Sequence, residues 1–256
     1  MDIIFFHGFM GSHHDWHEIT CKLDSSVVDC CNIYLINLPG HNSSPIGDQR
    51  IETQEFIDSL QQWIREQSIL APVFVGYSMG SRIAISLALA NQQTKGLFLE
   101  STSFGITDQK EREERKQADC KLFANINKTT FKDFLERWYE KPLFAGLKQH
   151  ENYNNFLINK LQRNDPVELD KAIKLLGVTS FDSFHEKIKQ LQMLFPITCL
   201  FGVDDEKYFT IGQQIKKLYS NVNVKFIDHC SHNVHFQKPE KYIIELNSFL
   251  QKVLER

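Results

Sequence analysis

The stretch Val73-Phe74-Val75-Gly76-Tyr77-Ser78-Met79-Gly80 decides the fold. A short apolar run leads into a Gly-x-Ser-x-Gly motif, and a pattern of apolar and small residues typical of a buried helix follows over residues 79–90. A serine at such a strand-to-helix junction occupies a turn so tight that the residues two before and two after it must be small. Its hydroxyl then projects from the helix N-terminus. The stretch therefore predicts that Ser78 is a reactive, exposed serine.

Five other apolar runs are bounded by glycine, proline or polar residues. They cover residues 3–6, 33–36, 97–99, 197–201 and 222–227. Runs of this kind are typical of strands that are buried on both faces of a parallel sheet. Helical patterns over residues 53–67, 79–90 and 241–254 are interspersed with them. The alternation predicts an α/β fold with a doubly wound, mostly parallel sheet.

One segment interrupts this alternation. Residues 107–194 contain no convincing strand run, and helical patterns cover residues 110–123, 131–139 and 167–177. We interpret residues 107–180 as a helical cap inserted over the C-terminal edge of the sheet, where open α/β sheets bind their ligands. A chain of 256 residues fits one large domain, so we expect a single domain over residues 1–256 with this insertion.

Composition and charge narrow the class of protein. The chain is 42% hydrophobic and 24% charged, a soluble globular balance, and its net charge of −3 offers no basic field for a nucleic acid. No apolar stretch approaches the roughly 18 residues of a membrane span. The N-terminal run is too short for a secretory signal and has Asp2 where such a signal carries a base. We therefore expect a cytoplasmic protein that binds neither nucleic acid nor membrane.

The cysteines indicate neither a disulfide framework nor a metal centre. The six are Cys21, Cys30, Cys31, Cys120, Cys199 and Cys230. None forms a Cys-x-x-Cys pair, and Cys30 and Cys31 are adjacent, so we expect reduced thiols. No His-Glu-x-x-His or similar spacing is present, and we expect no metal and no cofactor. The sequence carries no signal for the oligomeric state.

A reactive serine needs a histidine and an acid that orients it. In a sheet of this kind the chain order is serine, acid, histidine. After Ser78, the run over residues 197–201 leads to Asp204 and Asp205, and the run over residues 222–227 leads to His229 and His232. Both pairs follow strands on the same sheet edge as Ser78. We favour Asp205 and His232, with Asp204 and His229 as the alternatives.

The first apolar run ends at His7-Gly8-Phe9. Folds with this serine turn take one oxyanion-binding amide from the residue after the serine and a second from the loop after this strand. We therefore expect the backbone N–H groups of Met79 and Phe9 to bind a developing oxyanion. His7 is expected to hold the loop in place by hydrogen bonds.

Longer motifs make a resemblance specific. They are His7-Gly8-Phe9-Met10-Gly11-Ser12, Leu38-Pro39-Gly40-His41, Gly76-Tyr77-Ser78-Met79-Gly80-Ser81-Arg82, Trp138-Tyr139-Glu140-Lys141-Pro142-Leu143-Phe144-Ala145, Arg163-Asn164-Asp165-Pro166 and His232-Asn233-x-His235. With them the chain resembles the 2-succinyl-6-hydroxy-2,4-cyclohexadiene-1-carboxylate synthases, which have the α/β-hydrolase fold. The motifs over residues 138–145 and 163–166 distinguish this family from ordinary esterases. The chain departs from the family at Asn37, where aspartate is usual.

The resemblance implies a lyase of menaquinone biosynthesis. Such a lyase eliminates pyruvate from 2-succinyl-5-enolpyruvyl-6-hydroxy-3-cyclohexene-1-carboxylate, with Ser78 as the base and with His232 and Asp205 activating it. Three carboxylates on this substrate call for several cations, preferably arginines.

The expected substrate-binding residues come from the elbow and from the insertion. They are Tyr77, Arg82, Arg115, Trp138 and Arg163. Arg82 lies one turn after Ser78, and Lys160 competes with Arg163 for the third cationic position. Charge pattern alone would favour a solvated helix face for Arg115, and only the resemblance favours a binding role.

Two other functions fit the same motifs. The first is a serine hydrolase that forms an acyl-enzyme with an ester or thioester. The second is a binding module that keeps the fold without the activity. Because this fold hosts many chemistries, the fold alone does not choose among them.

Overall fold

The computed structural model describes residues 1–48, 50–124 and 130–256. Its sheet contains β1 (Asp2–Phe6), β2 (Asn32–Ile36), β3 (Pro72–Tyr77), β4 (Gly96–Glu100), β5 (Ile197–Gly202) and β6 (Val222–Ile227). The strand order is β2-β1-β3-β4-β5-β6, and every neighbouring pair is parallel. Each apolar run that was predicted as a strand lies within one of these six strands. The predicted doubly wound, parallel α/β sheet is confirmed.

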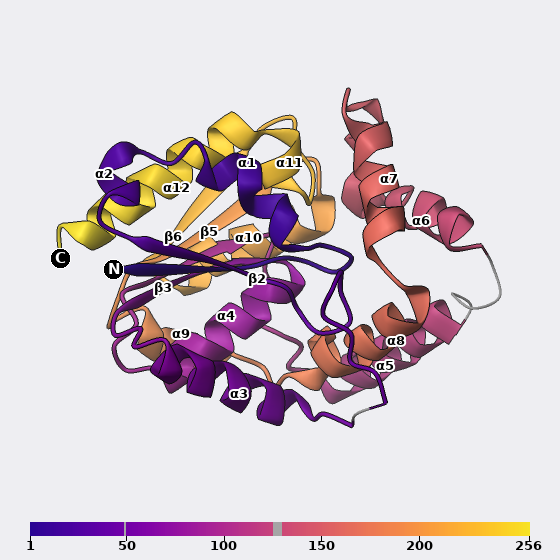
Figure 1. Cartoon of the computed structure of the whole chain (residues 1–256), viewed down its shortest axis with the longest axis horizontal. Helices are drawn as coiled ribbons and strands as arrows, with labels where there is room; N and C mark the ends of the chain where they lie inside the picture. The colour runs from indigo at the N-terminus through magenta and orange to yellow at the C-terminus, as the bar shows by residue number, and fades with distance from the viewer. Residues whose placement is uncertain (49, 125–129) are drawn as a thin grey trace.

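Helices cover both faces of the sheet (Figure 1). The α-helices are α1 (His17–Thr20), α2 (Ser25–Val28), α3 (Thr53–Glu66), α4 (Met79–Ala90), α5 (Gln109–Ala124), α6 (Phe131–Tyr139), α7 (Tyr153–Arg163), α8 (Pro166–Leu176), α9 (His185–Leu191), α10 (Glu206–Leu218), α11 (Val234–Gln237) and α12 (Pro239–Leu254). Short 3-10 turns are η1 (His13–Trp16), η2 (Pro142–Phe144), η3 (Leu147–Gln149) and η4 (Val178–Ser180). Helices α1, α2 and α12 pack on one face, and α3, α4, α9 and α10 pack on the other.

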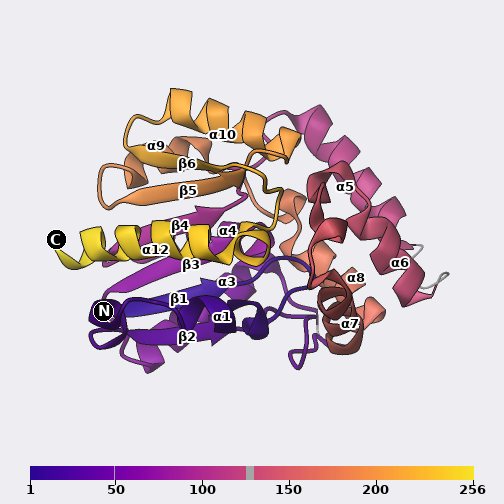
Figure 2. The ribbon, with the colours of Figure 1, turned by 90° about the horizontal axis from the view of Figure 1, so that it is seen from above.

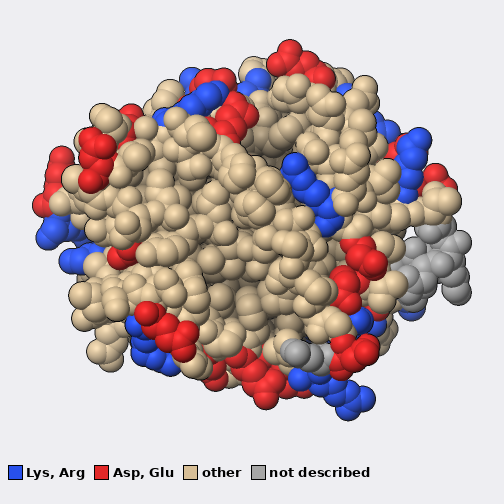
Figure 3. Space-filling model, viewed as in Figure 1, with Lys and Arg blue, Asp and Glu red and all other residues tan. Residues whose placement is uncertain are grey.

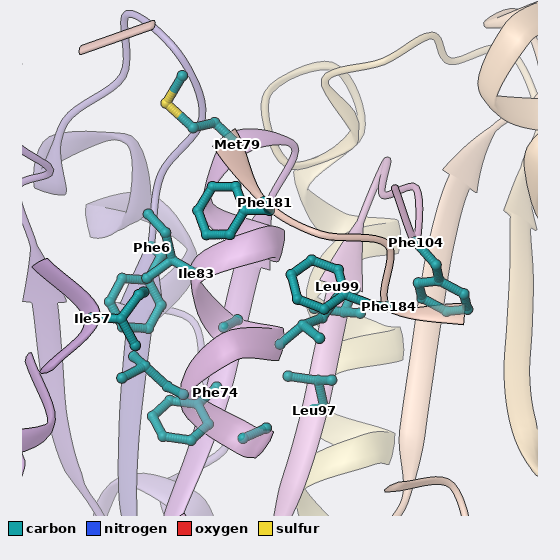
Figure 4. Close-up of a cluster of buried hydrophobic side chains, with 14 of the residues drawn as sticks. Phe6, Ile57, Phe74, Met79, Ile83, Leu97, Leu99, Phe104, Phe181 and Phe184 are labelled. Atoms are coloured by element: carbon teal, nitrogen blue, oxygen red, sulfur yellow. The ribbon is translucent and has the colours of Figure 1, made fainter. Parts of the chain in front are cut away.

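The alternation of side chains along each strand creates two cores. On β1, Ile4 and Phe6 face the α3–α4 side, whereas Ile3 and Phe5 face the α12 side. Figure 4 shows the first of these cores, where Phe6 and Phe74 of the sheet meet residues of α3 and α4. Complete burial of one large apolar side chain contributes roughly 1.5–3 kcal/mol. Burial on both sides explains why the strands read as continuous apolar runs.

Helices α5 to α8, called the inserted helices below, lie together at one end of the sheet (Figure 2). Between β4 and β5 the described residues form helices and turns and contain no strand. The predicted helical patterns at residues 110–123, 131–139 and 167–177 correspond to α5, α6 and α8. The inserted helices lie beyond the carboxyl ends of the strands, the edge at which a binding site was expected.

The surface gives no sign of a nucleic-acid interface on the face that Figure 3 shows. Basic and acidic side chains intermix around the rim of this face, and its described part carries no extended field of one charge. Among the described residues, no helix has the length and apolar character needed to cross a membrane. The six cysteines are all free thiols, as predicted.

Candidate active site

Ser78 lies between β3 and α4 in a strained backbone conformation. Its φ of 49° and ψ of −102° place it outside the regions that side-chain-bearing residues prefer. The Ser78 N–H donates to the Glu100 carbonyl at 2.9 Å, which ties the turn to β4. A Cβ at Gly76 would lie 2.6 Å from Ser81 Cα, and a Cβ at Gly80 would overlap the Phe6 carbonyl oxygen. Both glycines are therefore required for this turn.

Ser78, His232 and Asp205 form a hydrogen-bonded row. Nε2 of His232 lies 2.9 Å from Ser78 Oγ, and Nδ1 lies 2.7 Å from Asp205 Oδ2. Asp205 is 1% exposed and His232 is 2% exposed. Both sequence alternatives, Asp204 and His229, are exposed residues. The structure thus brings together the serine, acid and histidine that the sequence analysis favoured.

The N-terminus of α10 fixes the Asp205 carboxylate. Asp205 is the N-cap residue, and its Oδ1 accepts the Tyr208 N–H at 3.2 Å. One carboxylate oxygen is therefore held by the helix while the other faces His232. A buried carboxylate in this position orients the imidazole so that Nδ1 carries the proton and Nε2 is free to accept one.

The backbone of His232 is held from two sides. Ser101 Oγ donates to the His232 carbonyl at 2.7 Å, and the His232 N–H donates to the Leu143 carbonyl at 3.3 Å. Leu143 belongs to η2 within the predicted insertion. The rings of Tyr208 and Tyr77 lie 4.5 and 5.6 Å from the imidazole, centroid to centroid. The insertion therefore contributes directly to the position of the histidine.

The two amides expected to bind an oxyanion come from the first residue of α4 and from the loop after β1. Met79 is the first residue of α4, so its N–H belongs to the helical turn whose amides lack intrahelical acceptors. Phe9 follows Gly8, which packs so closely on Tyr77 that a Cβ there would lie 2.5 Å from Tyr77 Cε1. The Phe9 ring lies 5.4 Å from that of Trp138, which α6 supplies.

His7 fixes the loop that carries Phe9. The Leu38 N–H donates to His7 Nε2 at 3.0 Å, and His7 Nδ1 therefore carries the proton and donates to the Gly8 carbonyl at 2.8 Å. Burial, followed by the nearby His41, lowers the pKa of His7 to about 3, so the ring is neutral. The predicted hydrogen-bonding role of His7 is confirmed.

Arg82 is a buried cation whose hydrogen bonding is incomplete. It is 7% exposed, and its Nη2 donates to the Leu176 carbonyl at 3.0 Å, at the end of α8. Its Nε has no hydrogen-bond partner among the described residues. Burial is the main cause that lowers the pKa of Arg82 to about 10; Tyr208 opposes this shift, and the charge of Arg115 adds to it. A buried guanidinium in this state is suited to receive an anionic ligand.

Two more cations act electrostatically on this region. Arg115 Nε donates to both Asp119 oxygens, at 2.8 and 2.9 Å, so the solvated helical pair that its charge pattern favoured is present. Lys141 Nζ lies 3.6 Å from the centroid of the Trp138 ring. Burial first and the charge of Arg115 second lower the pKa of Lys141 to about 8. We call Arg82, Arg115 and Lys141 the cation cluster.

Arg163 and Lys160 have other surroundings. Lys160 Nζ forms an ion pair with Asp15 Oδ2 at 2.7 Å. Arg163 acts on His14, whose pKa it lowers together with burial, the larger cause. None of the described interactions joins either residue to Arg82. The expected binding role of Arg163, with Lys160 as the alternative, stays a prediction. Lys141, three residues after Trp138, was not among the cations that the sequence analysis singled out.

Comparison with known proteins places these features in a family context. The family described as alpha/beta hydrolase fold matches residues 3–239. A putative 2-succinyl-6-hydroxy-2,4-cyclohexadiene-1-carboxylate synthase of Bacillus subtilis is 25% identical, over 98% of this chain and 90% of that protein. The synthase of Klebsiella pneumoniae subsp. pneumoniae is 26% identical, over 97% and 93% of the two chains.

Solved structures give the same picture of the fold. MenH from S. aureus superposes with a TM-score of 0.86 at 22% identity, over 99% of this chain and 94% of that one. A carboxylesterase of Nitrososphaera gargenis superposes with a TM-score of 0.78 at 17% identity, over 99% and 91%. The resemblance that the sequence motifs indicated is confirmed, and the same fold is shared with esterases.

Proposed function

The chain belongs to the alpha/beta hydrolase fold family, and we propose that within it the protein is a 2-succinyl-6-hydroxy-2,4-cyclohexadiene-1-carboxylate synthase. The observation that carries the proposal is the buried Arg82, one helical turn after Ser78, whose Nε has no hydrogen-bond partner among the described residues. An ester substrate needs no such group, whereas a substrate with three carboxylates does. The similarity to the synthases of Bacillus subtilis and Klebsiella pneumoniae supports the same assignment.

In the proposed mechanism Ser78 is the base. Asp205 accepts a hydrogen bond from the Nδ1–H of His232, so Nε2, which lies 2.9 Å from Ser78 Oγ, is positioned to take the proton of the hydroxyl. The Ser78 oxygen then removes the hydrogen from the ring carbon that bears the succinyl group. Asp205 stabilises the imidazolium that forms, because its buried carboxylate lies 2.7 Å away.

Removal of this proton places negative charge on the ketone oxygen of the succinyl group. We propose that the Met79 and Phe9 amides stabilise this charge, since preorganised N–H donors cost little reorganisation during the reaction. The ring double bond then shifts as the carbon–oxygen bond to the enolpyruvyl group breaks. Pyruvate leaves as its enolate and takes up a proton, and the two conjugated double bonds of the product ring remain.

The cation cluster is proposed to hold the substrate carboxylates. Arg82 is the central member, because it is buried and lies one helical turn from Ser78. Lys141 and Arg115 come from the predicted insertion, and the charge of Arg115 acts on both Arg82 and Lys141. Tyr77, beside His232, and Trp138, beneath the Lys141 ammonium, are proposed to line the site. Arg163, whose charge acts on His14, stays a predicted carboxylate ligand with Lys160 as the alternative.

Residues 107–180 are proposed to act as the cap of a single domain. The supporting contacts join the inserted helices and their turns to the active-site loops: Leu143 accepts from His232, Leu176 accepts from Arg82, and Asn164 Nδ2 donates to the Met10 carbonyl at 3.2 Å. These contacts make the site dependent on the insertion. Substrate selection therefore depends on residues far from the serine in sequence.

Pyruvate release tests the proposed function. The purified protein is given the enolpyruvyl substrate, generated in situ by the enzyme that makes it, and pyruvate is followed with lactate dehydrogenase against a blank without the protein. We expect release that is lost in Ser78→Ala and strongly reduced in Arg82→Met and Lys141→Met. Arg137→Met, an exposed arginine on α6, is the matched control and should retain full activity.

A serine hydrolase remains the second candidate, because the same row of Ser78, His232 and Asp205 supports acyl transfer and the carboxylesterase superposes well. Activated esters distinguish the two functions. Ser78-dependent ester cleavage with a burst, together with pyruvate release no faster than the blank, would exclude the synthase and leave the hydrolase.

A further inference from the structure

Three histidines gather outside the active site, on the segment that follows the Phe9 loop. His13 and His14 belong to η1, and His17 begins α1. One ring nitrogen from each lies within 4.8 Å of the other two. The ring centroids of His13 and His14 are 3.9 Å apart, and those of His14 and His17 are 4.9 Å apart. The proposed reaction uses none of these side chains.

We propose that His13, His14 and His17 bind one divalent transition-metal ion of the Zn²⁺ or Ni²⁺ class. Imidazole is a preferred ligand for these ions. Residues three and four apart in a helical segment share one face, which is the relationship of His17 to His14 and His13. Zinc–nitrogen bonds of about 2.0–2.1 Å bring tetrahedral ligands to roughly 3.4 Å from one another. The ring nitrogens lie within 4.8 Å of one another in the structure, and rotation of the exposed His17 side chain and of its neighbours brings them to the shorter separation that the ion requires.

Asn37 prepares His13 for this role. Asn37 Oδ1 accepts the His13 backbone N–H at 2.9 Å and lies 3.0 Å from His13 Nδ1. Asn37 Nδ2 donates to Ser43 Oγ at 3.4 Å, which fixes the amide with its oxygen toward His13. Nδ1 of His13 therefore carries the proton, and the lone pair of Nε2 is available to a metal. Metal-binding histidines characteristically have such an outer partner on the second nitrogen.

Nearby charges do not help this site. Arg163 carries a positive charge that acts on His14 and opposes a divalent cation. Asp15 is the neighbouring carboxylate, but it is paired with Lys160. The proposed site therefore consists of three imidazole ligands with a fourth position for water, and the bound ion would link η1 to α1.

Titration calorimetry of the full chain, freed of metal with a chelator, tests the proposal with Zn²⁺ and Ni²⁺ separately. We expect one ion per chain, with binding at least tenfold weaker in His14→Ala and in His17→Ala. Asn37→Ala should weaken binding about 10–100-fold, the range typical of outer-shell partners. Asn37→Asp should strengthen it, because a carboxylate makes His13 a better donor. His229→Asn, an exposed histidine elsewhere, should have no effect.

Exposed cysteine thiols are the alternative metal ligands, and cysteine-to-serine variants distinguish them from the histidines. Cys21, Cys30 and Cys120 are exposed, and Cys31 is partly exposed, so each is changed to serine in a second background. Retention of the single high-affinity site there supports the histidines, as does nitrogen hyperfine structure in the electron paramagnetic resonance spectrum of bound Cu²⁺. The proposal is overturned if no ion binds, if binding follows the cysteines, or if the triple histidine-to-alanine variant binds as well as the original protein.

Discussion

Lys160 of α7 and Asp15 of η1 form an ion pair with a separation of 2.7 Å, in which the two side chains are 8% and 15% exposed. The pair connects the inserted helices to the segment that follows the Phe9 loop. Burial alone would raise the pKa of Asp15, but the charge and hydrogen bond of Lys160 outweigh it and leave the pKa below its ordinary value. Because both charges are removed from water, loss of one partner leaves the other uncompensated.

Lys160→Met should therefore destabilise the protein by about 3–5 kcal/mol, the usual result of breaking a buried pair from one side. Urea unfolding followed by circular dichroism measures this change. The matched control is Lys148→Met, which removes the partner of Glu140 in a pair whose side chains are 41% and 56% exposed and should cost at most about 1 kcal/mol. Equal effects of the two substitutions would contradict the importance of burial.

Acid should remove the contribution of Asp15 to the free energy of unfolding. Its folded pKa lies below that of an ordinary aspartate, about 3.9, so the stabilisation is complete above that value and is lost as the pH falls through the folded pKa. Over this range a single proton changes the free energy of unfolding by at most about 1.4 kcal/mol per pH unit. The double variant Asp15→Asn/Lys160→Met should show a shallower acid slope in the same urea experiment. An unchanged slope would show that other carboxylates govern acid unfolding.

Asp205→Asn should lower kcat by up to about 10⁴, because an amide in this position no longer holds the His232 tautomer that accepts the serine proton. Steady-state pyruvate release measures the effect. Asp204→Asn, at the adjacent exposed position, should leave kcat within twofold of the original value, an expectation that rests on its exposure. A larger loss in Asp204→Asn than in Asp205→Asn would reverse the assignment of the acid.

Arg82→Met should raise the melting temperature and lower kcat/KM together. A buried guanidinium without a carboxylate partner opposes folding, as its pKa of about 10 indicates, and methionine of similar length fills the space. We expect a gain of about 1 kcal/mol, reduced by the lost hydrogen bond to Leu176. Calorimetric melting and pyruvate release are measured on the same preparation. A loss of both stability and activity would indicate a structural role only.

Ser78→Gly should be more stable than Ser78→Ala by about 1 kcal/mol, because the φ of 49° at this position strains any residue that carries a Cβ. Both variants lack the hydroxyl and should release no pyruvate. The difference between their free energies of unfolding, measured by chemical denaturation, therefore reports the backbone strain at this position. If Ser78→Ala is the more stable variant, contacts of the side chain outweigh the backbone strain at this position.

Much of the fold could be predicted from the sequence, because strands and tight turns depend on residues that are close together along the chain. Strands buried on both faces, such as β3, β4 and β5, are apolar almost throughout, and this made them visible as runs. The edge strands β2 and β6 are only partly buried, and β6 includes the exposed Asn223. The turn at Ser78 was equally visible, because Gly76 and Gly80 are where a Cβ would collide. Helix α7 was missed: its first turn, Tyr153-Asn154-Asn155, consists of weak helix formers, and it is held by packing and by the Lys160 pair.

Part of the candidate site was likewise predictable from the sequence, and the rest needed the structure. Chain order and strand ends narrowed the acid to Asp204 or Asp205 and the histidine to His229 or His232, since all carboxyl ends of a parallel sheet meet at one edge; the catalytic roles of the favoured pair stay predictions. The distinction between Asp205 and Asp204 needed the structure, because only one of two adjacent carboxylates caps α10 and turns inward.

Local sequence thus determined the sheet, the serine turn and the order of the reactive groups. Tertiary structure alone decided which partner each cation has. Lys141, Lys160 and Arg163 are all cations of the predicted insertion, but Lys160 contacts Asp15, 145 residues away along the chain, while Lys141 lies over Trp138 and is affected by the charge of Arg115. The charge that a cation faces depends on partners brought close by folding, and that information is absent from any local pattern.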